Sequence, residues 1–348
     1  MAAETIGPVE ALREVAFWRE RRRDETRRVE AYRKAADALA TLTPDDLAVL
    51  AGSDAWQSIP GVGPSTAAVI REAAGGGIPT ALADLRQWGQ RPLAESSLLA
   101  DLRGDLHTHT TWSDGGSPLA EMVATAARLG REYLAVTDHS PRLRVANGLS
   151  AERLTEQWVE IARVQSEQPD IRVLRGIEVD ILDDGSLDQR DDLLADLDIV
   201  VASVHSKLQM DAQYMTRRMV GAIANPRTTV LGHCTGRKVE KGPRGESKVR
   251  GQSEFDAEVV FAACAQFDVA VEINSRPERN DPPDDLLALA SELGCLFAID
   301  TDAHAPGQLD FLALGAARAE AAGIEPDRII TTWPVERLLE FSRPGRGA

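Results

Sequence analysis

Seven short β-rich segments recur between residues 105 and 304, and they limit the fold more than any other feature of the chain. Amphipathic stretches such as Ser117–Gly130 and Pro283–Gly294 separate them. Such alternation is typical of an α/β protein built on a parallel sheet. The segments are DLHTH (105–109), YLAVTDH (133–139), IRVLRGIEVD (171–180), LDIVVASVHS (197–206), TTVLGHC (228–234), VAVEINS (269–275) and CLFAIDTDAH (295–304).

All six histidines of the chain lie at the C-terminal ends of these segments. In a β/α barrel those ends form one rim, and active sites are built there. Carboxylates lie at or just beyond the same ends. A lone histidine is more often structural than a ligand, but six of six at one rim favours a metal site. The residues are His107, His109, His139, His205, His233 and His304, with Asp114, Asp138, Glu178 and Asp302.

Imidazole and carboxylate ligands without thiolate suit Zn²⁺, Mn²⁺ or Fe²⁺ in a hydrolytic site. So many ligands predict more than one metal ion. The three cysteines are odd in number and widely spaced, which favours reduced thiols in a cytoplasmic protein over disulfides or a thiolate zinc site. They are Cys234, Cys264 and Cys295.

The N-terminal region has a different texture. Residues 8–40 show helical periodicity, and IPGVGPSTAAVIREA follows at 59–73. Its two glycines permit a tight turn between helices, and free N–H groups at the start of the second helix can hold an anion. The pattern resembles a helix-hairpin-helix motif, which grips the DNA backbone without reading bases; a plain helical turn is the alternative. DNA contacts are expected at Gly61, Gly63, Ser65, Arg27 and Lys34.

The charge distribution argues against a generally nucleic-acid-binding surface. The net charge is −16, and residues 1–104 carry 13 basic and 15 acidic side chains of the total. Two local stretches are basic, Arg19–Lys34 with eight basic and four acidic residues and Arg237–Arg250 with six and two. Each is either a solvated face or a binding surface. No apolar run reaches the length of a membrane span, so we expect no membrane association.

Several phrases resemble the PHP (polymerase and histidinol phosphatase) domain, specifically the one at the C-terminus of bacterial family X DNA polymerases. The N-terminal residues similarly resemble the small DNA-binding domain of those polymerases. The resemblance implies a small all-α helix-hairpin-helix domain at 1–80, a linker at 81–103, a distorted seven-stranded (β/α) barrel at 104–342 and a tail at 343–348. The matching phrases are RGDLHTHTTWSDG, TDHSPRLRVANGL, GIEVDILDDGSLD, VVASVHS, GHCTGR and TDAH.

The resemblance also implies a site for up to three divalent metal ions. His107, His109, Glu178 and Asp302 would hold one ion. Glu178 would bridge to a second ion held by His205 and His233. Asp114, His139 and His304 would hold a third. Of these residues, His107, Glu178 and Asp302 are expected to be essential for activating water. Cys234 stands where the family usually has proline, which we interpret as a packing change.

Two departures from those polymerases limit the expected activity. The segment Ala81–Arg103 leaves no room for a polymerase core, so we expect no polymerase activity. The second helix of the hairpin begins PSTAAVI and lacks the lysine at which lyase-competent relatives form a Schiff base. Lys34 is the only lysine before Lys207, so deoxyribose-phosphate lyase chemistry is not expected either.

A cation cluster still needs donors that orient a phosphate, and arginine suits two-pronged contact with phosphate. Candidates follow the strand ends, although each could equally be a solvated loop charge. They are Arg144, Asn147, Lys207, Arg237 and Arg276.

Three functions fit these features. The first is a metal-dependent phosphodiesterase acting on DNA, namely a 3′–5′ exonuclease or 3′-end-processing enzyme of DNA repair that binds the backbone as a monomer. The second is a small-molecule phosphatase of the histidinol-phosphate phosphatase type. The third is a DNA-binding module whose metal site is vestigial. The filled ligand set argues against the third, and the added hairpin domain favours the first.

Overall fold

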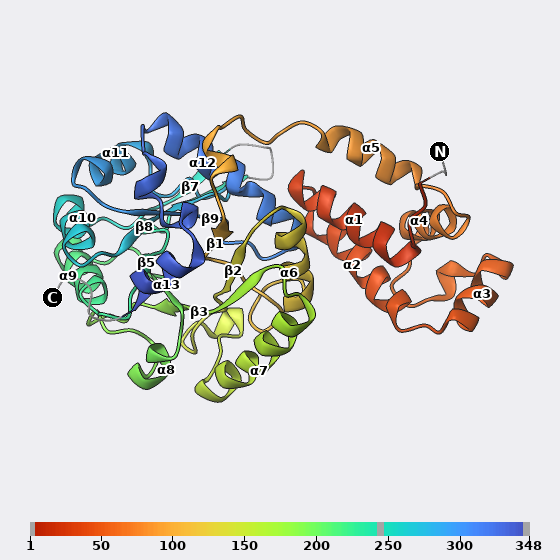
Figure 1. The fold of residues 1–348 in the computed structure, drawn as a ribbon, viewed down its shortest axis with the longest axis horizontal. Coiled ribbons are helices and arrows are strands. Elements are labelled where there is room, and N and C mark those ends of the chain that lie inside the picture. Colours follow the sequence, from red (N-terminus) through yellow and green to blue (C-terminus); the bar gives the residue numbers. More distant parts are fainter. Residues whose placement is uncertain (1–3, 242–246, 344–348) are drawn as a thin grey trace. The chain divides into compact units, whose positions relative to one another are not determined.

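Seven parallel strands form one sheet in a computed structural model that describes residues 4–241 and 247–343. The strands pair in chain order, and each falls inside one of the seven predicted segments or at its start (Figure 1), which confirms the α/β prediction. They are β1 (Gly104–Asp105), β2 (Tyr133–Val136), β3 (Arg172–Asp180), β4 (Ile199–Ser203), β5 (Val230–Leu231), β8 (Ala270–Asn274) and β9 (Phe297–Asp300).

The sheet curls into a nearly closed barrel. Its first and last strands approach each other just past their ends, where Thr108 forms a parallel bridge with Ala303 and the His109 amide donates to the Ala303 carbonyl at 2.8 Å. The carboxylate of Asp300 accepts the Leu106 amide at 2.8 Å. Because all seven strands are parallel, their C-terminal ends share one rim, as expected for a barrel.

Helices follow the strands and cover the outside of this barrel (Figure 1). Their apolar faces pack on the strands, as in β/α units generally. They are α6 (Leu119–Arg128), α7 (Ala151–Glu167), α8 (Asp191–Ala195), α9 (Ala212–Ile223), α10 (Ala257–Gln266), α11 (Asp284–Glu292), α12 (Leu312–Ala321) and α13 (Val335–Ser342). Short 3₁₀ turns lie at Leu98–Ala100, Arg144–Ala146, Pro306–Phe311, Pro326–Arg328 and Ile330–Thr332.

A second β element interrupts the barrel after β5. The strands β6 (Lys238–Lys241) and β7 (Ser247–Arg250) pair antiparallel and form a two-stranded sheet of their own. The sequence marked this stretch only as a basic run. Its charged residues hide the alternation of apolar and polar side chains that would have indicated strands.

The N-terminal unit is entirely helical and has its own core. Thr43 caps the third helix, since its hydroxyl accepts the Asp46 amide at 3.2 Å. Gly61 takes φ 85° in the turn before the fourth helix, a backbone conformation that favours glycine. The helices are α1 (Pro8–Arg21), α2 (Thr26–Ala40), α3 (Pro44–Ser53), α4 (Pro64–Ala74) and α5 (Thr80–Gly89), with a 3₁₀ turn at Trp56–Ser58.

The division between the units differs from the expected linker at 81–103. The chain divides between Pro92 and Leu93. Helix α5 buries Leu82 and Leu85 in the core of the helical unit, whereas Leu98 and Leu102 belong to the barrel core. The sequence could not predict which core these four leucines join, because too few apolar residues lie in this segment to form a periodic pattern.

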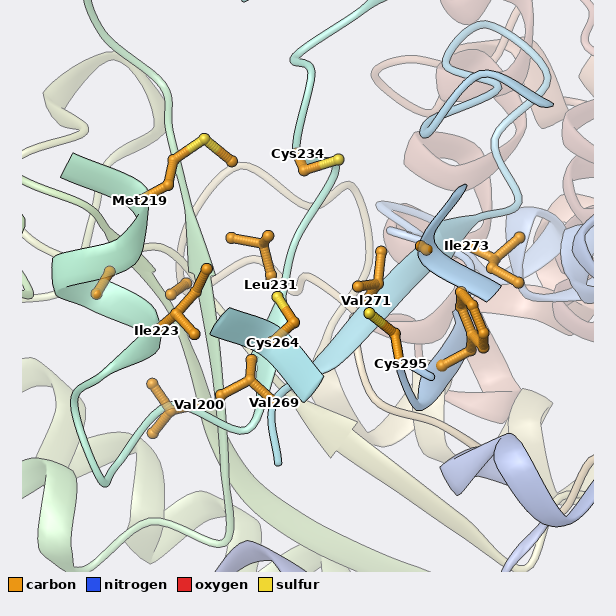
Figure 2. Packing of buried hydrophobic residues seen from close by; sticks show 14 of the residues in the cluster. Val200, Met219, Ile223, Leu231, Cys234, Cys264, Val269, Val271, Ile273 and Cys295 are labelled. Atoms are coloured by element: carbon orange, nitrogen blue, oxygen red, sulfur yellow. The ribbon is translucent and has the colours of Figure 1, made fainter. Parts of the chain in front are cut away.

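The three cysteines are buried free thiols. Figure 2 shows Cys264 and Cys295 among apolar side chains such as Val269 and Val271. Burial raises the pKa of both thiols. The thiol of Cys234 lies 3.7 Å from the Asp281 carboxylate and is buried in the same core, in keeping with a packing role. No helix among the described residues is both long and apolar enough to cross a bilayer.

Candidate metal centre

The nine expected ligands meet at the C-terminal rim of the barrel. Each lies within or just beyond a strand: Glu178 is in β3, and the others follow the ends of β1, β2, β4, β5 and β9. The side chains form four overlapping groups whose nitrogen and oxygen atoms lie within 4.8 Å of one another. The groups are His109–Asp114–His139–His304, His107–His109–Asp302, His107–Glu178–His233 and His139–Glu178–His205.

Glu178 lies at the centre of the cluster and is 1% exposed. Its Oε1 lies 3.1 Å from His205 Nε2 and 2.9 Å from His233 Nε2. Its Oε2 faces three other rings, at 3.3 Å from His107 Nε2, 3.5 Å from His109 Nε2 and 2.8 Å from His139 Nδ1. Each carboxylate oxygen therefore serves a different set of imidazoles, which is the arrangement a bridging ligand needs.

Asp114 and Asp302 complete the cluster. Asp302 Oδ1 is 3.4 Å from His109 Nε2. Asp114 Oδ1 is 3.5 Å from both His139 Nε2 and His304 Nε2. His139 thus has one ring nitrogen toward Asp114 and the other toward Glu178, so it lies between two of the expected ion positions.

Buried atoms without hydrogen-bond partners mark the site as one for cations. Buried polar atoms are nearly always hydrogen-bonded, yet several ring nitrogens and both Glu178 oxygens have no such partner in the described structure. A group of lone pairs pointing at one another is stabilised by a cation between them. The nitrogens are Nε2 of His107 and His205, both ring nitrogens of His109 and His233, and Nδ1 of His139.

Outer carboxylates orient the imidazoles. Glu272 Oε1 lies 2.5 Å from His107 Nδ1, and Asp180 Oδ1 lies 2.5 Å from His205 Nδ1. An acceptor at Nδ1 leaves Nε2 free to face the centre, as in many metal sites. Neither acid was expected at the site from the sequence. The available signals were an acid inside the apolar strand segment VAVEINS and the spacing of Asp180 two residues after Glu178, on the same strand face.

Electrostatics keeps the central carboxylates ionised. Burial alone would raise the pKa of Glu178, but His205, His107 and His139 outweigh it and hold that pKa well below its ordinary value. Burial would lower the pKa of His205, but Glu178 and the hydrogen bond to Asp180 raise it to about 9. Divalent cations bound here would therefore displace protons from imidazoles. The histidine and acid cluster could bind several such ions.

Comparison with known families and relatives agrees with this geometry. A family model of the helix-hairpin-helix domain matches residues 7–77, and a model of the PHP domain matches residues 105–238. The chain contains a helix-hairpin-helix domain followed by a PHP domain. Both families suspected from the sequence motifs are thereby confirmed.

Three relatives illustrate the range of similar proteins. The DNA polymerase/3′-5′ exonuclease PolX of Bacillus subtilis is 36% identical over 76% of this chain, which spans only 46% of that protein. A probable phosphatase of Vibrio parahaemolyticus is 27% identical over 69% of this chain and 93% of its own. The solved histidinol phosphate phosphatase of Lactococcus lactis, complexed with zinc, L-histidinol and phosphate, has a TM-score of 0.46, with 21% identity over 64% of this chain and 94% of its own.

The structure separates the expected phosphate-binding residues of the PHP domain. Arg276 reaches the centre, since its Nη1 lies 3.2 Å from His304 Nδ1. Arg144 is exposed, and Arg237 is half-buried with no side-chain partner among the described residues. Lys207 forms an exposed ion pair with Asp183.

Asn147 forms hydrogen bonds that hold its own loop. Its Nδ2 donates to the Trp112 carbonyl at 3.2 Å, and its own carbonyl accepts from Arg153 at 2.7 Å. It also adopts φ 56°, which asparagine tolerates better than most residues. These bonds hold the loop after β2, and the phosphate contact of this exposed side chain stays a prediction.

Arg279 contacts the metal cluster and was not anticipated. Its Nε donates to Asp302 Oδ2 at 2.8 Å, and Asp302 itself adopts φ 52°. Burial would lower the pKa of Arg279, but Asp302 and other acids raise it. A cation fixed on Oδ2 leaves Oδ1 facing His109. Arg279 lies beyond the end of β8 (Ala270–Asn274), and no local sequence pattern indicated that it would reach the rim.

The helix-hairpin-helix domain places its expected DNA contacts on its surface. Ser65 and Arg27 are exposed, and Gly63 precedes α4 as its N-cap residue. Lys34 packs near Gly61, because a methyl group added to the Gly61 Cα would lie 4.0 Å from the Lys34 Cβ. The basic stretch Arg19–Lys34 is largely paired internally, through Arg19–Asp24, Arg22–Asp24, Arg33–Glu20 and Lys34–Glu30.

Proposed function

We propose that this chain is a metal-dependent phosphoesterase that hydrolyses DNA phosphodiesters, as a 3′–5′ exonuclease or 3′-end-processing enzyme of DNA repair without polymerase activity. The observation that carries the proposal is the convergence of unpartnered ring nitrogens on the buried Glu178 carboxylate. A helix-hairpin-helix domain in the same chain supports DNA as the substrate, because a soluble monophosphate needs no grip on a nucleic-acid backbone.

The ligand geometry suits up to three divalent ions, whether Zn²⁺, Mn²⁺ or Fe²⁺. Such ions, when bound, would polarise the phosphoryl group and lower the pKa of a water molecule. The protein holds the ligand atoms apart at fixed distances, with Glu178 between two sets and Asp114, His139 and His304 forming a third. The residues most important for activating water would be His107, Glu178 and Asp302. Glu178 and Asp302 both face the ring of His109, and His107 faces the bridging carboxylate of Glu178.

Arginines at the rim would orient the phosphate. Arg276 lies beside His304, and Arg237 follows His233 by four residues with its guanidinium unpaired among the described side chains. Backbone binding of DNA would come from the hairpin around Gly61 and Gly63. These contacts recognise phosphates and not bases, so the enzyme would act on DNA ends without sequence preference.

A small-molecule phosphatase of the histidinol-phosphate phosphatase type is the second candidate. It is favoured by relatives named as probable phosphatases, such as the Vibrio parahaemolyticus protein that this chain matches over 93% of its length. Such an enzyme would use the same metal ligands but would need no DNA-binding domain.

One experiment separates the two candidates. The purified protein receives Mn²⁺ together with a labelled single strand, a gapped duplex, or histidinol phosphate. Stepwise shortening of the 3′ end with negligible phosphate release from histidinol phosphate supports the nuclease. Rapid phosphate release from histidinol phosphate with intact DNA would overturn it and establish the second candidate.

A further inference from the structure

The base of the β6–β7 hairpin carries two cations in an unfavourable arrangement. Lys238 and Arg250 are directly opposite in the antiparallel register, and like charges in that position destabilise a strand pair. Arg250 is exposed and Lys238 is half-buried. Neither forms an ion pair with any carboxylate among the described residues. An anion bound between them would offset the repulsion.

The hairpin base is fixed to the rim of the barrel. Asp281 holds the segment that leads into β6, since its Oδ2 accepts the Thr235 hydroxyl at 2.8 Å and the Arg237 amide at 3.2 Å. Arg250 Nη2 donates to the Gly236 carbonyl at 2.7 Å. The guanidinium therefore has a set position at the base of the hairpin, with other donors left for a ligand.

The loop after β8 connects this base to the metal centre. The Val239 amide donates to the Glu278 carbonyl at 2.5 Å. Arg276, two residues before Glu278, contacts His304. Arg279, one residue after Glu278, contacts Asp302. The hairpin base is thus bonded to the loop whose two arginines contact expected metal ligands.

We propose that Lys238 and Arg250 form a binding position for a backbone phosphate next to the scissile one. The inference rests on the proposed nuclease function and adds that the PHP domain itself selects a strand with several phosphates over a monophosphate. Residues 105–348 have a large acidic excess, which repels polyanions at long range. Local cations at the rim overcome that repulsion where the substrate must lie.

The test compares two substrates in the full-length protein with Mn²⁺, a single-stranded hexanucleotide and bis(p-nitrophenyl) phosphate. The measured quantity is the ratio of kcat/KM on the strand to kcat/KM on the small ester. We expect Lys238→Gln combined with Arg250→Gln to lower this ratio at least about tenfold. The slope of log kcat/KM against log salt on the strand should become shallower by about 1.4, or about 0.7 for each single-strand phosphate that is no longer neutralised.

Two further variants serve as controls. Lys238→Arg combined with Arg250→Lys keeps both charges and should restore the ratio. Arg172→Gln removes one exposed cation at the first residue of β3, the opposite end of the barrel, and should leave the ratio unchanged. If the double Gln variant fails to fold, Lys238→Gln alone should still lower the ratio, because Lys238 makes no side-chain hydrogen bond among the described residues.

The outcomes distinguish this inference from the function on which it rests. An unchanged ratio in the Gln variants, with the wild-type protein shortening the strand, would overturn the hairpin proposal and leave the nuclease intact. A wild-type protein that hydrolyses the ester but never the strand would overturn both. A lower ratio with an unchanged salt slope would show that the two side chains do not contact phosphates, and would also overturn it.

Discussion

Glu178 is the residue on which the metal centre depends most, because its two oxygens face five imidazoles. Glu178→Gln keeps the size of the side chain but removes the charge and points an amide donor at ring nitrogens. We expect it to lose at least two equivalents of metal and to lower phosphoester hydrolysis at least about a hundredfold, since even ligand-supporting residues matter by about tenfold to a hundredfold. Metal analysis and ester turnover measure this.

Glu292 provides the matched control for that substitution. It is an exposed glutamate on α11, so Glu292→Gln makes the same chemical change away from the site. Metal content and turnover should match those of the wild-type protein. Full metal content in the Glu178→Gln protein would refute the bridging role.

Glu272 contacts His107 Nδ1, so we expect it to act on a bound metal ion through that ring, as a positioning residue. Its loss in Glu272→Gln removes the charged partner at Nδ1 while the ligand itself remains. We expect metal affinity to fall about tenfold to a hundredfold, with turnover restored at high metal concentration. Titration of the metal-free protein with Mn²⁺ gives the affinity directly. A loss of turnover that saturating metal does not restore would assign Glu272 a different role.

The raised pKa of His205 makes metal binding dependent on pH. A protonated imidazole has no lone pair at Nε2, and this ring has a pKa of about 9. Below that pH a cation must displace the proton, so apparent affinity should fall about tenfold per pH unit for each proton released. Calorimetric titration with Mn²⁺ in buffers of different ionisation enthalpy counts the protons. Equal affinity at pH 6 and pH 8 would contradict this account.

At the scale of elements, helix α5 belongs to the helical unit and not to the expected linker. It contributes Leu82, which is fully buried, to the helical core. We expect Leu82→Ala to destabilise that unit by about 2–5 kcal/mol. Val49→Ala, on the exposed side of α3, should change stability by no more than about 0.5 kcal/mol. Denaturant unfolding followed by tryptophan fluorescence gives the free energy of unfolding of the two variants. Equal values would mean that α5 does not contribute to the core of the helical unit.

At the scale of the whole molecule, the division after Pro92 predicts how the two units share the work. Deleting residues 1–92 should retain turnover of a small ester, because every expected metal ligand lies beyond Arg103, but should weaken hydrolysis of long or gapped DNA. Deleting residues 1–100 should also destabilise the barrel, since Leu98 lies in its core at 4% exposure. Melting temperature and the two activities test this. Equal loss on both substrates after the shorter deletion would argue against separate roles.

The expectation that the chain lacks polymerase and lyase activity can be tested on the whole molecule. The described residues form two units, a helical one and one that contains the barrel and the β6–β7 hairpin. We expect no nucleotide incorporation on a primed template, and no borohydride trapping on an abasic 5′ end that depends on Lys34. Either activity in the purified protein would refute the corresponding expectation.

Local sequence was enough to predict the strands and the convergence of the histidines at their ends. Strand patterns are local, and parallel strands bring all their C-terminal ends to one rim, so the positions of the six histidines already implied that they meet. The PHP and helix-hairpin-helix motifs are likewise short and contiguous. Nothing beyond local order was needed to identify them.

The side chains that support that site could be identified only in the folded chain. Glu272 lies 165 residues from His107 in the chain, and Arg279 lies 23 residues from Asp302. The ion pair of Lys207 with Asp183 and the bond of Asn147 to Trp112 are likewise contacts that the sequence did not indicate. Such contacts depend on which loops meet when the barrel closes. Local periodicity carries no information about that, because it records which face a residue occupies and not what lies opposite.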